Sequence, residues 1–419
     1  MIRTRYSRSG LKLRFEPVSR MCLAAVDEGA TPGLVVLVAA RGQTLFHQAF
    51  GARQMVPRRL PALPDTMYDV ASLTNAVATS VLAMQEIGGG RLTLDTKVST
   101  LLPELCDRTG ADAGHRDESD IARGTSEPGV VSQVVRNDIT VRQLLSHSSG
   151  LPAHRPFWKQ AAHSPAERLA IARLAAREPL AYPPGTRAVY SDLGFILLGW
   201  LLERLTGARL DVLFQDRIAR PLGLTATTFV NLADPEARAR LLGDRTVAAT
   251  QISAERHGLV LGEVDDQNAF AMGGIAGHAG LFSTAGDLAT IATALLASFH
   301  GQGHGQNHGQ NQDQSDDGLV ARDVIRQFWS SSGVPGSTWR LGWDGPAEAG
   351  SQAGEKLSRA AVGHLAFTGC SLWIDPLQEI VMVLLSNRVH PAVPTDDRFR
   401  RFRPILQDAL LAALGYDGR

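Results

Sequence analysis

Strand-like segments lie at both ends of this chain and helical segments lie between them, which constrains the fold more than any other feature. Residues 33–40 and 43–50 are two apolar-rich runs joined by a short turn, the pattern of a β-hairpin. Three more strand candidates occur near the C-terminus, at residues 337–342, 370–375 and 380–386. A sheet assembled from both termini follows. The predicted class is α+β, an antiparallel sheet flanked by helices with an inserted all-helical domain.

Helical periodicity dominates the middle of the chain. Apolar residues recur at helical spacing over residues 73–86, 141–146, 165–176, 193–205, 210–218 and 285–298. Two further helices are expected near the termini, at 18–28 and 398–414. These elements predict a discontinuous α/β sandwich domain (14–75 and 320–419) and a mainly helical domain (76–299). A polar segment near 107–133 and a low-complexity loop at 300–318 are expected to be disordered.

Composition excludes several classes of partner. Lys+Arg and Asp+Glu are balanced at 42 each, and no basic stripe with interleaved aromatic residues suggests nucleic acid. No apolar run has the length of a membrane span. The first twenty residues lack the apolar stretch of a secretory signal, so the protein is expected to be cytoplasmic, or periplasmic or exported if the start is mis-assigned. Its three cysteines lack metal-ligand spacing, and neither a cofactor nor a metal is expected. The oligomeric state is left open.

Ser72 is the first residue that suggests chemistry. It stands between the strand-like residues 67–70 and the amphipathic run that begins at Leu73. Acyl transfer needs a rigidly held nucleophile and backbone donors for the developing oxyanion. A serine at a helix start supplies the nucleophile, and the unpaired N–H groups there supply donors. An ordinary N-cap serine has the same local sequence, so this fragment alone leaves both interpretations open.

Two later segments contain further candidate catalytic residues. Tyr190 follows a Pro/Gly turn and directly precedes the helix predicted at 193–205. His364 precedes small residues at the edge of the predicted sheet. Taken singly, Tyr190 is most simply a packing aromatic residue, and His364 is most simply a hydrogen-bonded structural histidine.

Taken in order, the three segments resemble the signature elements of the class C β-lactamase, penicillin-binding-protein and esterase family. These are a Ser-x-x-Lys helix, a Tyr-x-Asn or Tyr-Ser-Asp element and a Lys-Thr-Gly or His-Thr-Gly strand. The likeness runs from about residue 35 to residue 391 and includes the stretches 139–152 and 274–285. The resemblance implies an α/β sandwich domain split by a helical domain, with the active site in the cleft between them. It also implies acyl-enzyme chemistry on a small ester, amide or peptide-like substrate.

Family roles carried over by position assign four residues. The resemblance implies that Ser72 is the nucleophile and that Tyr190 is the general base or its relay. Asp192 would contact the substrate or the tyrosine loop. The backbone amides of Ser72 and Phe367 would form the oxyanion hole.

The chain departs from the family pattern at the catalytic lysine. That residue should lie one turn after the nucleophile, because positions i and i+3 share a helix face, and Asn75 stands there. An amide neither accepts a proton at working pH nor supplies a positive charge. In the third element His364 takes the lysine position, while Leu365 and Ala366 replace threonine and glycine. These changes remove a substrate-binding hydroxyl and add bulk beside the oxyanion strand.

These departures leave the mechanism open. One hypothesis is that His364 deprotonates Tyr190, which then takes the proton from Ser72. Hydrolysis should then fall below a pKa near the usual ~6.5 of histidine. Two functions remain. The first is a serine hydrolase, weak or altered in mechanism and leaning towards esters, because Asp192 and His364 offer less positive charge for a substrate carboxylate. The second is an inactive pseudoenzyme that binds a ligand or cell-wall fragment. A metal hydrolase using His147, His278 and His364 is disfavoured, because these residues lack a close pair on one helix face.

Overall fold

A computed structural model describes residues 8–106, 136–161, 168–302 and 318–416 of the chain. The predicted disordered segment near 107–133, and most of the low-complexity loop at 300–318, lie outside the described residues.

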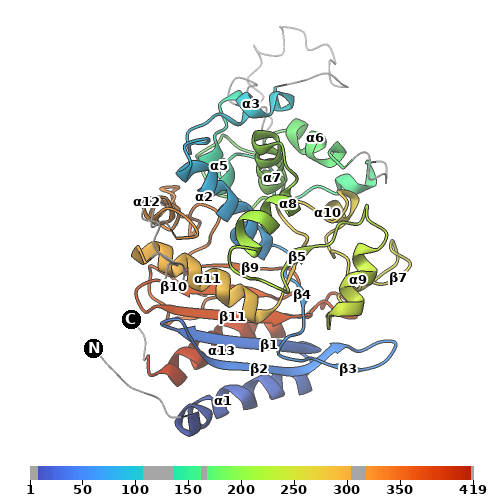
Figure 1. Cartoon of the computed structure of the whole chain (residues 1–419), viewed down its shortest axis with the longest axis vertical. Helices are drawn as coiled ribbons and strands as arrows, with labels where there is room; N and C mark the ends of the chain where they lie inside the picture. Colours follow the sequence, from blue (N-terminus) through green and yellow to red (C-terminus); the bar gives the residue numbers. More distant parts are fainter. Residues whose placement is uncertain (1–7, 107–135, 162–167, 303–317, 417–419) are drawn as a thin grey trace, which may run out of the picture.

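The central feature is a six-stranded antiparallel sheet with the order β3-β2-β1-β11-β10-β9. Its strands are β1 (Gly33–Ala40), β2 (Gln43–Gln54), β3 (Leu60–Pro61), β9 (Val362–Leu365), β10 (Ser371–Asp375) and β11 (Ile380–Ser386). Strand β1 pairs with β11 over seven positions, from Leu34↔Ser386 to Ala40↔Ile380. Figure 1 shows the N-terminal strands in blue beside the C-terminal strands in red. The predicted sheet built from both termini is therefore confirmed.

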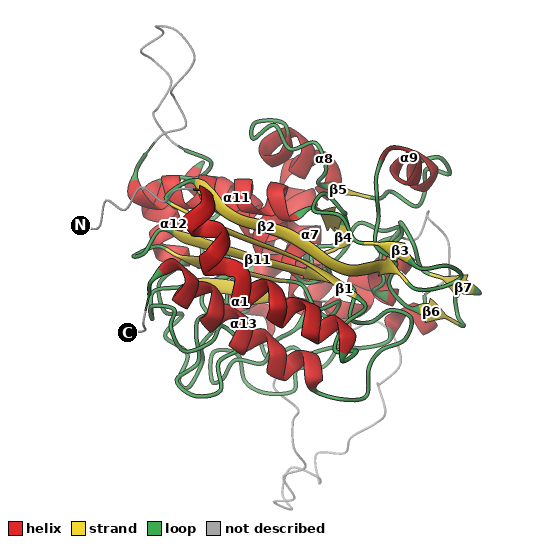
Figure 2. Ribbon diagram, turned by 90° about the horizontal axis from the view of Figure 1, so that it is seen from below, coloured by secondary structure: helices red, strands yellow, loops and turns green. Residues whose placement is uncertain are grey.

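Helices cover both faces of this sheet, which explains why β1 and β11 are apolar almost throughout. Leu34, Val36 and Val38 pack with α1 (Arg8–Asp27) and α13 (Arg398–Leu414). The alternating residues Val35 and Leu37 belong to the other core, which includes residues of α11 (Ala285–His300). Side chains alternate between the faces of a strand, so a strand buried on both sides shows no polar period. Figure 2 shows α1 and α13 side by side across one face.

The middle of the chain is mainly helical. It contains η1 (Asn75–Ser80), α2 (Val81–Gly88), α3 (Val98–Leu101), η2 (Pro103–Leu105), α5 (Val141–Leu145), η4 (Phe157–Lys159), α6 (Ala170–Arg177), α7 (Asp192–Thr206), α8 (Leu210–Phe214), η6 (Gln215–Ala219), α9 (Ala237–Asp244) and α10 (Gln267–Ala271). Short strands accompany them: β4 (Tyr68–Asp69), β5 (Thr228–Phe229), β6 (Ile252–Ser253), β7 (Gly258–Leu259) and β8 (Leu281–Ser283). Strands of two or three residues are too short to show an alternating pattern in the sequence. Helix α12 (Arg322–Phe328) leads back to the sheet.

Several predicted bounds need correction. Residues 337–342 form no strand, and the nearest pairing is a single bridge between Asp344 and Gly363. Leu341 and Trp343 are buried, as strand residues would be, but no neighbouring strand pairs with this segment. Helix α1 begins ten residues before the predicted start at residue 18. Helix α13 has the predicted bounds and runs through Pro404 without a break. No helix in the described parts of the chain has the length and hydropathy needed to cross a bilayer.

Candidate active site

A cavity of about 670 Å³ brings most of the predicted site residues together. Its lining includes Ser72, Tyr190, Asp192, His364, Ala366 and Phe367. These residues come from the turn after β4, the start of α7, the edge strand β9 and the loop that follows β9. The seventh predicted residue, Asn75, is fully buried and does not line the cavity.

Ser72 lies in a tight turn between β4 and η1. The preceding residue, Ala71, has a φ of 43°, in the left-handed region. For a non-glycine residue this conformation costs roughly 1–3 kcal/mol. Two hydrogen bonds hold it, from Ala71 N to Asp69 Oδ1 at 2.9 Å and from Thr74 Oγ1 to the Ala71 carbonyl at 2.6 Å. The side chain of Thr74, and not that of Ser72, makes the local turn bond, so the N-cap interpretation of Ser72 loses its support.

The Asn75 amide connects the tyrosine to the segment around His278. One end of the amide lies 3.2 Å from the Gly277 carbonyl oxygen and 3.3 Å from that of His278. Carbonyl oxygens only accept hydrogen bonds, so this end is the nitrogen. The other end is the oxygen, which accepts a hydrogen bond from the Tyr190 hydroxyl at 3.1 Å. The phenolic oxygen of Tyr190 therefore keeps a lone pair for the Ser72 hydroxyl, with which it also interacts.

Tyr190 is a neutral phenol at physiological pH. Burial is the main cause that raises the pKa of Tyr190 well above its usual 10, and the Asp192 carboxylate adds to it. The hydrogen bond from the Ser72 hydroxyl opposes this rise without cancelling it. Donation of the Tyr190 O–H to the Asn75 oxygen favours the neutral phenol and so acts in the same direction as burial. Since no lysine stands at position 75, no positive charge there favours the phenolate. Tyr190 can orient the Ser72 hydroxyl but does not carry a negative charge ready to take its proton.

His364 is also neutral. Its Nδ1 lies 2.7 Å from the Leu365 carbonyl oxygen and must donate to it, which leaves a lone pair on Nε2. Burial lowers the pKa of His364 to about 4, so the expected titration near ~6.5 is wrong, because burial disfavours the imidazolium. The Asn75 amide atom 3.5 Å from Nε2 is the oxygen in the orientation assigned above, and an acceptor makes no hydrogen bond with that lone pair. The ring centroids of His364 and Tyr190 lie 5.9 Å apart. Among the described residues no hydrogen bond joins these two side chains, so direct proton transfer between them is not set up.

This lowered pKa gives a pH prediction. The imidazole of His364 stays neutral above about pH 4, so its protonation should leave ester hydrolysis unaffected between pH 5 and 8. The pH–rate profiles of wild type and of His364→Gln should have the same shape over that range, measured by stopped assays with a p-nitrophenyl ester. An inflection between pH 6 and 7 that disappears in His364→Gln would restore the relay hypothesis.

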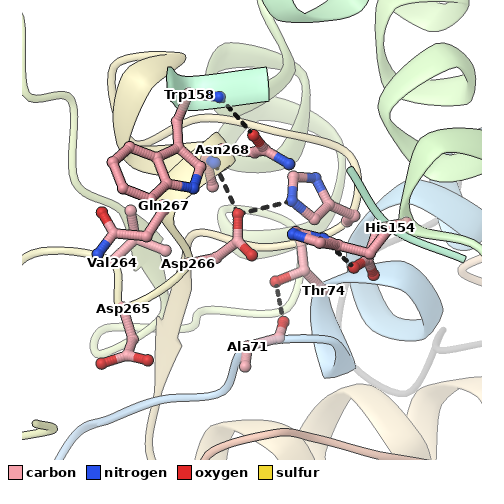
Figure 3. A network of polar contacts seen from close by, with 12 residues as sticks. Ala71, Thr74, His154, Trp158, Val264, Asp265, Asp266, Gln267 and Asn268 are labelled. Carbon is pink, nitrogen blue, oxygen red and sulfur yellow. Dashed lines mark hydrogen bonds and ion pairs between the residues drawn. The ribbon is translucent and has the colours of Figure 1, made fainter. Parts of the chain in front are cut away.

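Sequence reasoning missed one charged pair that lines the cavity. His278 Nε2 lies 2.9 Å from Asp266 Oδ1, and the same oxygen accepts from Ala269 N at 2.7 Å, at the start of α10. Burial opposes both charges, but their attraction raises the pKa of His278 and lowers that of Asp266 to about 2. Figure 3 shows Asp266 at the centre of this network, with His154 beside it. The two partners lie in separate loops, so no sequence period links them.

The cavity is poor in positive charge. Among the described residues no lysine or arginine lines it. Four carboxyl groups do, those of Asp192, Asp265, Asp266 and Asp344. The two lining histidines that favour the charged form are already paired, His154 with Asp192 and His278 with Asp266. A substrate carboxylate would therefore meet no unpaired cation in the described lining.

Two residues of the cavity lining, Ser72 and Phe367, have backbone amides without a hydrogen-bond partner in the described part of the chain. Among the hydrogen bonds of the described residues, none uses the N–H of Ser72 or that of Phe367. Strand β9 ends at Leu365, and the next amide, Ala366 N, donates to the Cys370 carbonyl at 2.8 Å. The chain turns after Ala366, so the Phe367 amide is not paired with a neighbouring strand, and Phe367 lines the cavity. Unpaired donors of this kind are what an oxyanion requires.

Comparisons with known proteins agree with this arrangement. The beta-lactamase family model matches residues 18–405. A putative D-alanyl-D-alanine carboxypeptidase of Escherichia coli (strain K12) is 30% identical over 397 residues, 91% of this chain and 83% of that protein. The N-acetylmuramyl-L-alanine amidase of Bacillus subtilis (strain 168) is 29% identical over 86% of this chain and 78% of its own. The solved structure of EstCE1, a hydrolase with promiscuous acyltransferase activity, has a TM-score of 0.65 at 21% identity, covering 96% of this chain and 99% of that chain. The predicted β-lactamase-like fold is confirmed.

Proposed function

Because this chain belongs to the beta-lactamase family of serine hydrolases, we propose that it cleaves esters through an acyl-enzyme formed on Ser72. One observation carries the proposal: the Ser72 hydroxyl interacts with the Tyr190 oxygen beside two unpaired amides in one cavity. The named activities of the relatives are carboxypeptidase and amidase, and that of the structural neighbour is hydrolase and acyltransferase. An ester is the least demanding substrate common to such chemistry.

The proposed reaction begins with attack of Ser72 Oγ on the ester carbonyl carbon. As this bond forms, the carbonyl electron pair moves to its oxygen, where the amides of Ser72 and Phe367 donate hydrogen bonds. The C–O bond to the leaving group then breaks, and the Ser72 proton leaves with the departing oxygen. Water repeats the attack on the acyl-enzyme and releases the acid.

The proton path limits this reaction. A neutral Tyr190 accepts the Ser72 proton only if its own proton leaves, and the Asn75 oxygen that receives its hydrogen bond is not a base at working pH. Loss of a positioned base usually costs about a hundred- to ten-thousandfold in rate. The protein should therefore act slowly, and on esters whose leaving groups need little protonation.

The charge of the cavity narrows the substrate further. A carboxypeptidase substrate ends in a carboxylate, and the described lining offers it four carboxyl groups and no lysine or arginine. An unpaired charge placed in a partly desolvated site costs several kcal/mol as an order of magnitude. The proposed substrates are therefore neutral esters, and their acyl chains would contact Trp158 and Trp339, which also line the cavity.

A matched pair of esters tests this proposal. p-Nitrophenyl butyrate and mono-p-nitrophenyl succinate have four-carbon acyl groups and the same leaving group, and only the succinate carries a carboxylate. The kcat/KM for butyrate should exceed that for succinate by at least about tenfold, since the carboxyl groups of the lining repel the succinate carboxylate. Added salt should narrow this difference by screening. A faster reaction with succinate would contradict the neutral-ester assignment, and no hydrolysis of either ester would contradict the proposed function.

The alternative function is a ligand-binding pseudoenzyme. The specific observations that favour it are the uncharged Asn75 at the lysine position and the raised pKa of Tyr190. It predicts that cavity ligands bind but that no covalent adduct forms on Ser72.

A further inference from the structure

Asp69 stands three residues before Ser72, and its carboxylate contacts two parts of the site. The residue is buried, with 2% of its surface exposed. Its Oδ1 accepts from Ala71 N at 2.9 Å, in the strained turn that carries the nucleophile. Its Oδ2 accepts from Asp265 N at 2.7 Å. Asp265 precedes Asp266, the partner of His278, so this second bond reaches the loop 264–267 on the cavity wall.

The backbone of Asp69 reaches a third part. Its carbonyl oxygen accepts from Thr368 Oγ1 at 2.9 Å and lies 3.8 Å from the Cys370 thiol. Thr368 directly follows Phe367, whose amide is the second oxyanion donor proposed above. Asp69 also pairs with Phe282 between β4 and β8, so the residue itself is held by a small sheet.

We propose that Asp69 is a positioning residue that sets the nucleophile turn, the loop 264–267 and the oxyanion segment 366–370 relative to one another. Its role in catalysis rests on the proposed function. The Ala71 conformation is unfavourable for alanine, and a carboxylate oxygen on the Ala71 N–H opposes its relaxation. The distance between Ser72 Oγ and the Phe367 amide then depends on two acceptors of Asp69: Oδ1, which holds the Ala71 turn, and the carbonyl oxygen, which holds Thr368. A displacement of about 1 Å at such a site can cost about a hundredfold in rate.

The position of Asp69 also ties this arrangement to pH. Burial and the nearby Asp265 carboxylate raise the pKa of Asp69 to about 7, and Asp266 contributes in the same direction. Arg256 and the Cys370 thiol are the other ionisable groups that interact with it. Only the ionised carboxylate offers acceptors on both oxygens to the two amides. Activity that depends on this geometry should fall as the pH drops through about 7.

Asp69→Asn is the direct test. The amide has the same shape but a single acceptor oxygen, so either Ala71 N or Asp265 N would face an NH₂ group. We expect kcat for p-nitrophenyl butyrate to fall by about tenfold to a hundredfold with KM unchanged, and the pH dependence near 7 to disappear. Asp375→Asn is the matched control, because Asp375 is also fully buried and accepts from the amides of Ser358, Leu377 and Gln378 away from the cavity. It should lose stability without losing kcat.

Hydrogen exchange supplies a readout that needs no turnover. In Asp69→Asn, peptides spanning 70–74, 264–268 and 366–370 should exchange faster together, whereas Asp375→Asn should leave them protected. If wild type shows no Ser72-dependent hydrolysis, the proposed function fails and this readout alone decides the role of Asp69. If Asp69→Asn does not fold, Thr368→Val should still lower kcat: it removes the hydrogen bond to the Asp69 carbonyl, together with a weak contact to the Cys370 thiol, and leaves both carboxylate bonds of Asp69 in place. The proposal is overturned if the folded Asp69 variant keeps the wild-type kcat, pH profile and exchange, or loses no more kcat than Asp375→Asn.

Discussion

Replacing Asn75 with lysine should raise kcat/KM for p-nitrophenyl butyrate by about a hundredfold or more, the usual effect of a positioned general base. The place for an ammonium group is already present. The Asn75 nitrogen lies 3.2 Å from the Gly277 carbonyl oxygen and 3.3 Å from that of His278, and both oxygens can accept from an ammonium. A positive charge there would oppose the effects of burial and of Asp192 on the pKa of Tyr190. The proton of Ser72 would then have an acceptor.

Steady-state kinetics with the butyrate ester and with nitrocefin measure this gain. Asn75→Gln is the matched control, because it lengthens the side chain without adding a charge, and it should give no gain. The pH profile of the lysine variant should also gain an acid limb, since only the deprotonated pair can take the proton. A folded lysine variant with wild-type kinetics would mean that the site has lost more than its base.

Replacing Ser72 with alanine should lower the rate of ester hydrolysis by at least about a thousandfold, because no acyl-enzyme can form without the nucleophile. An alkyl fluorophosphonate should label wild type on the peptide that contains Ser72 and should leave the variant unlabelled, as measured by mass spectrometry of the intact protein and its digest. The loss should appear in kcat, since the cavity and its walls remain.

Ser80→Ala is the control for this loss. Ser80 is a buried serine at the end of η1, the helical segment that follows the Ser72 turn; its hydroxyl has no hydrogen-bond partner, and it does not line the cavity. Its replacement should leave the rate within about twofold of wild type. Residual hydrolysis in Ser72→Ala equal to wild type would assign the activity to another group. An unlabelled wild type that still binds cavity ligands would favour the pseudoenzyme.

The sequence alone determined those helices and strands that the pattern of their own residues predicts. Helix α13 was predicted with correct bounds, and β1 and β11 were recognisable as continuous apolar runs between turns. The order of the Ser72, Tyr190 and His364 segments indicated the family. The sequence alone also shows that position 75 has asparagine in place of the family's lysine, and therefore that the usual general base is missing.

Only the tertiary structure decided what depends on burial and on contacts between distant segments. The sequence predicted a strand at 337–342, but this segment lies in a loop, and the nearest pairing is the single bridge between Asp344 and Gly363. His364 was expected to titrate near ~6.5, and burial lowers its pKa to about 4. Desolvation is set by the whole surrounding fold, so no local pattern contains it.

The same reason applies to the groups around Ser72. The hydrogen bond from Asp265 N to Asp69 joins residues 196 positions apart in the chain, and the ion pair of His278 with Asp266 joins two loops on either side of α10. Residue types and spacing can propose a candidate nucleophile, because the turn and helix around it are local. They cannot say which carbonyl oxygens the Asn75 amide faces or which carboxylate fixes the turn, because folding alone brings those atoms within hydrogen-bonding distance.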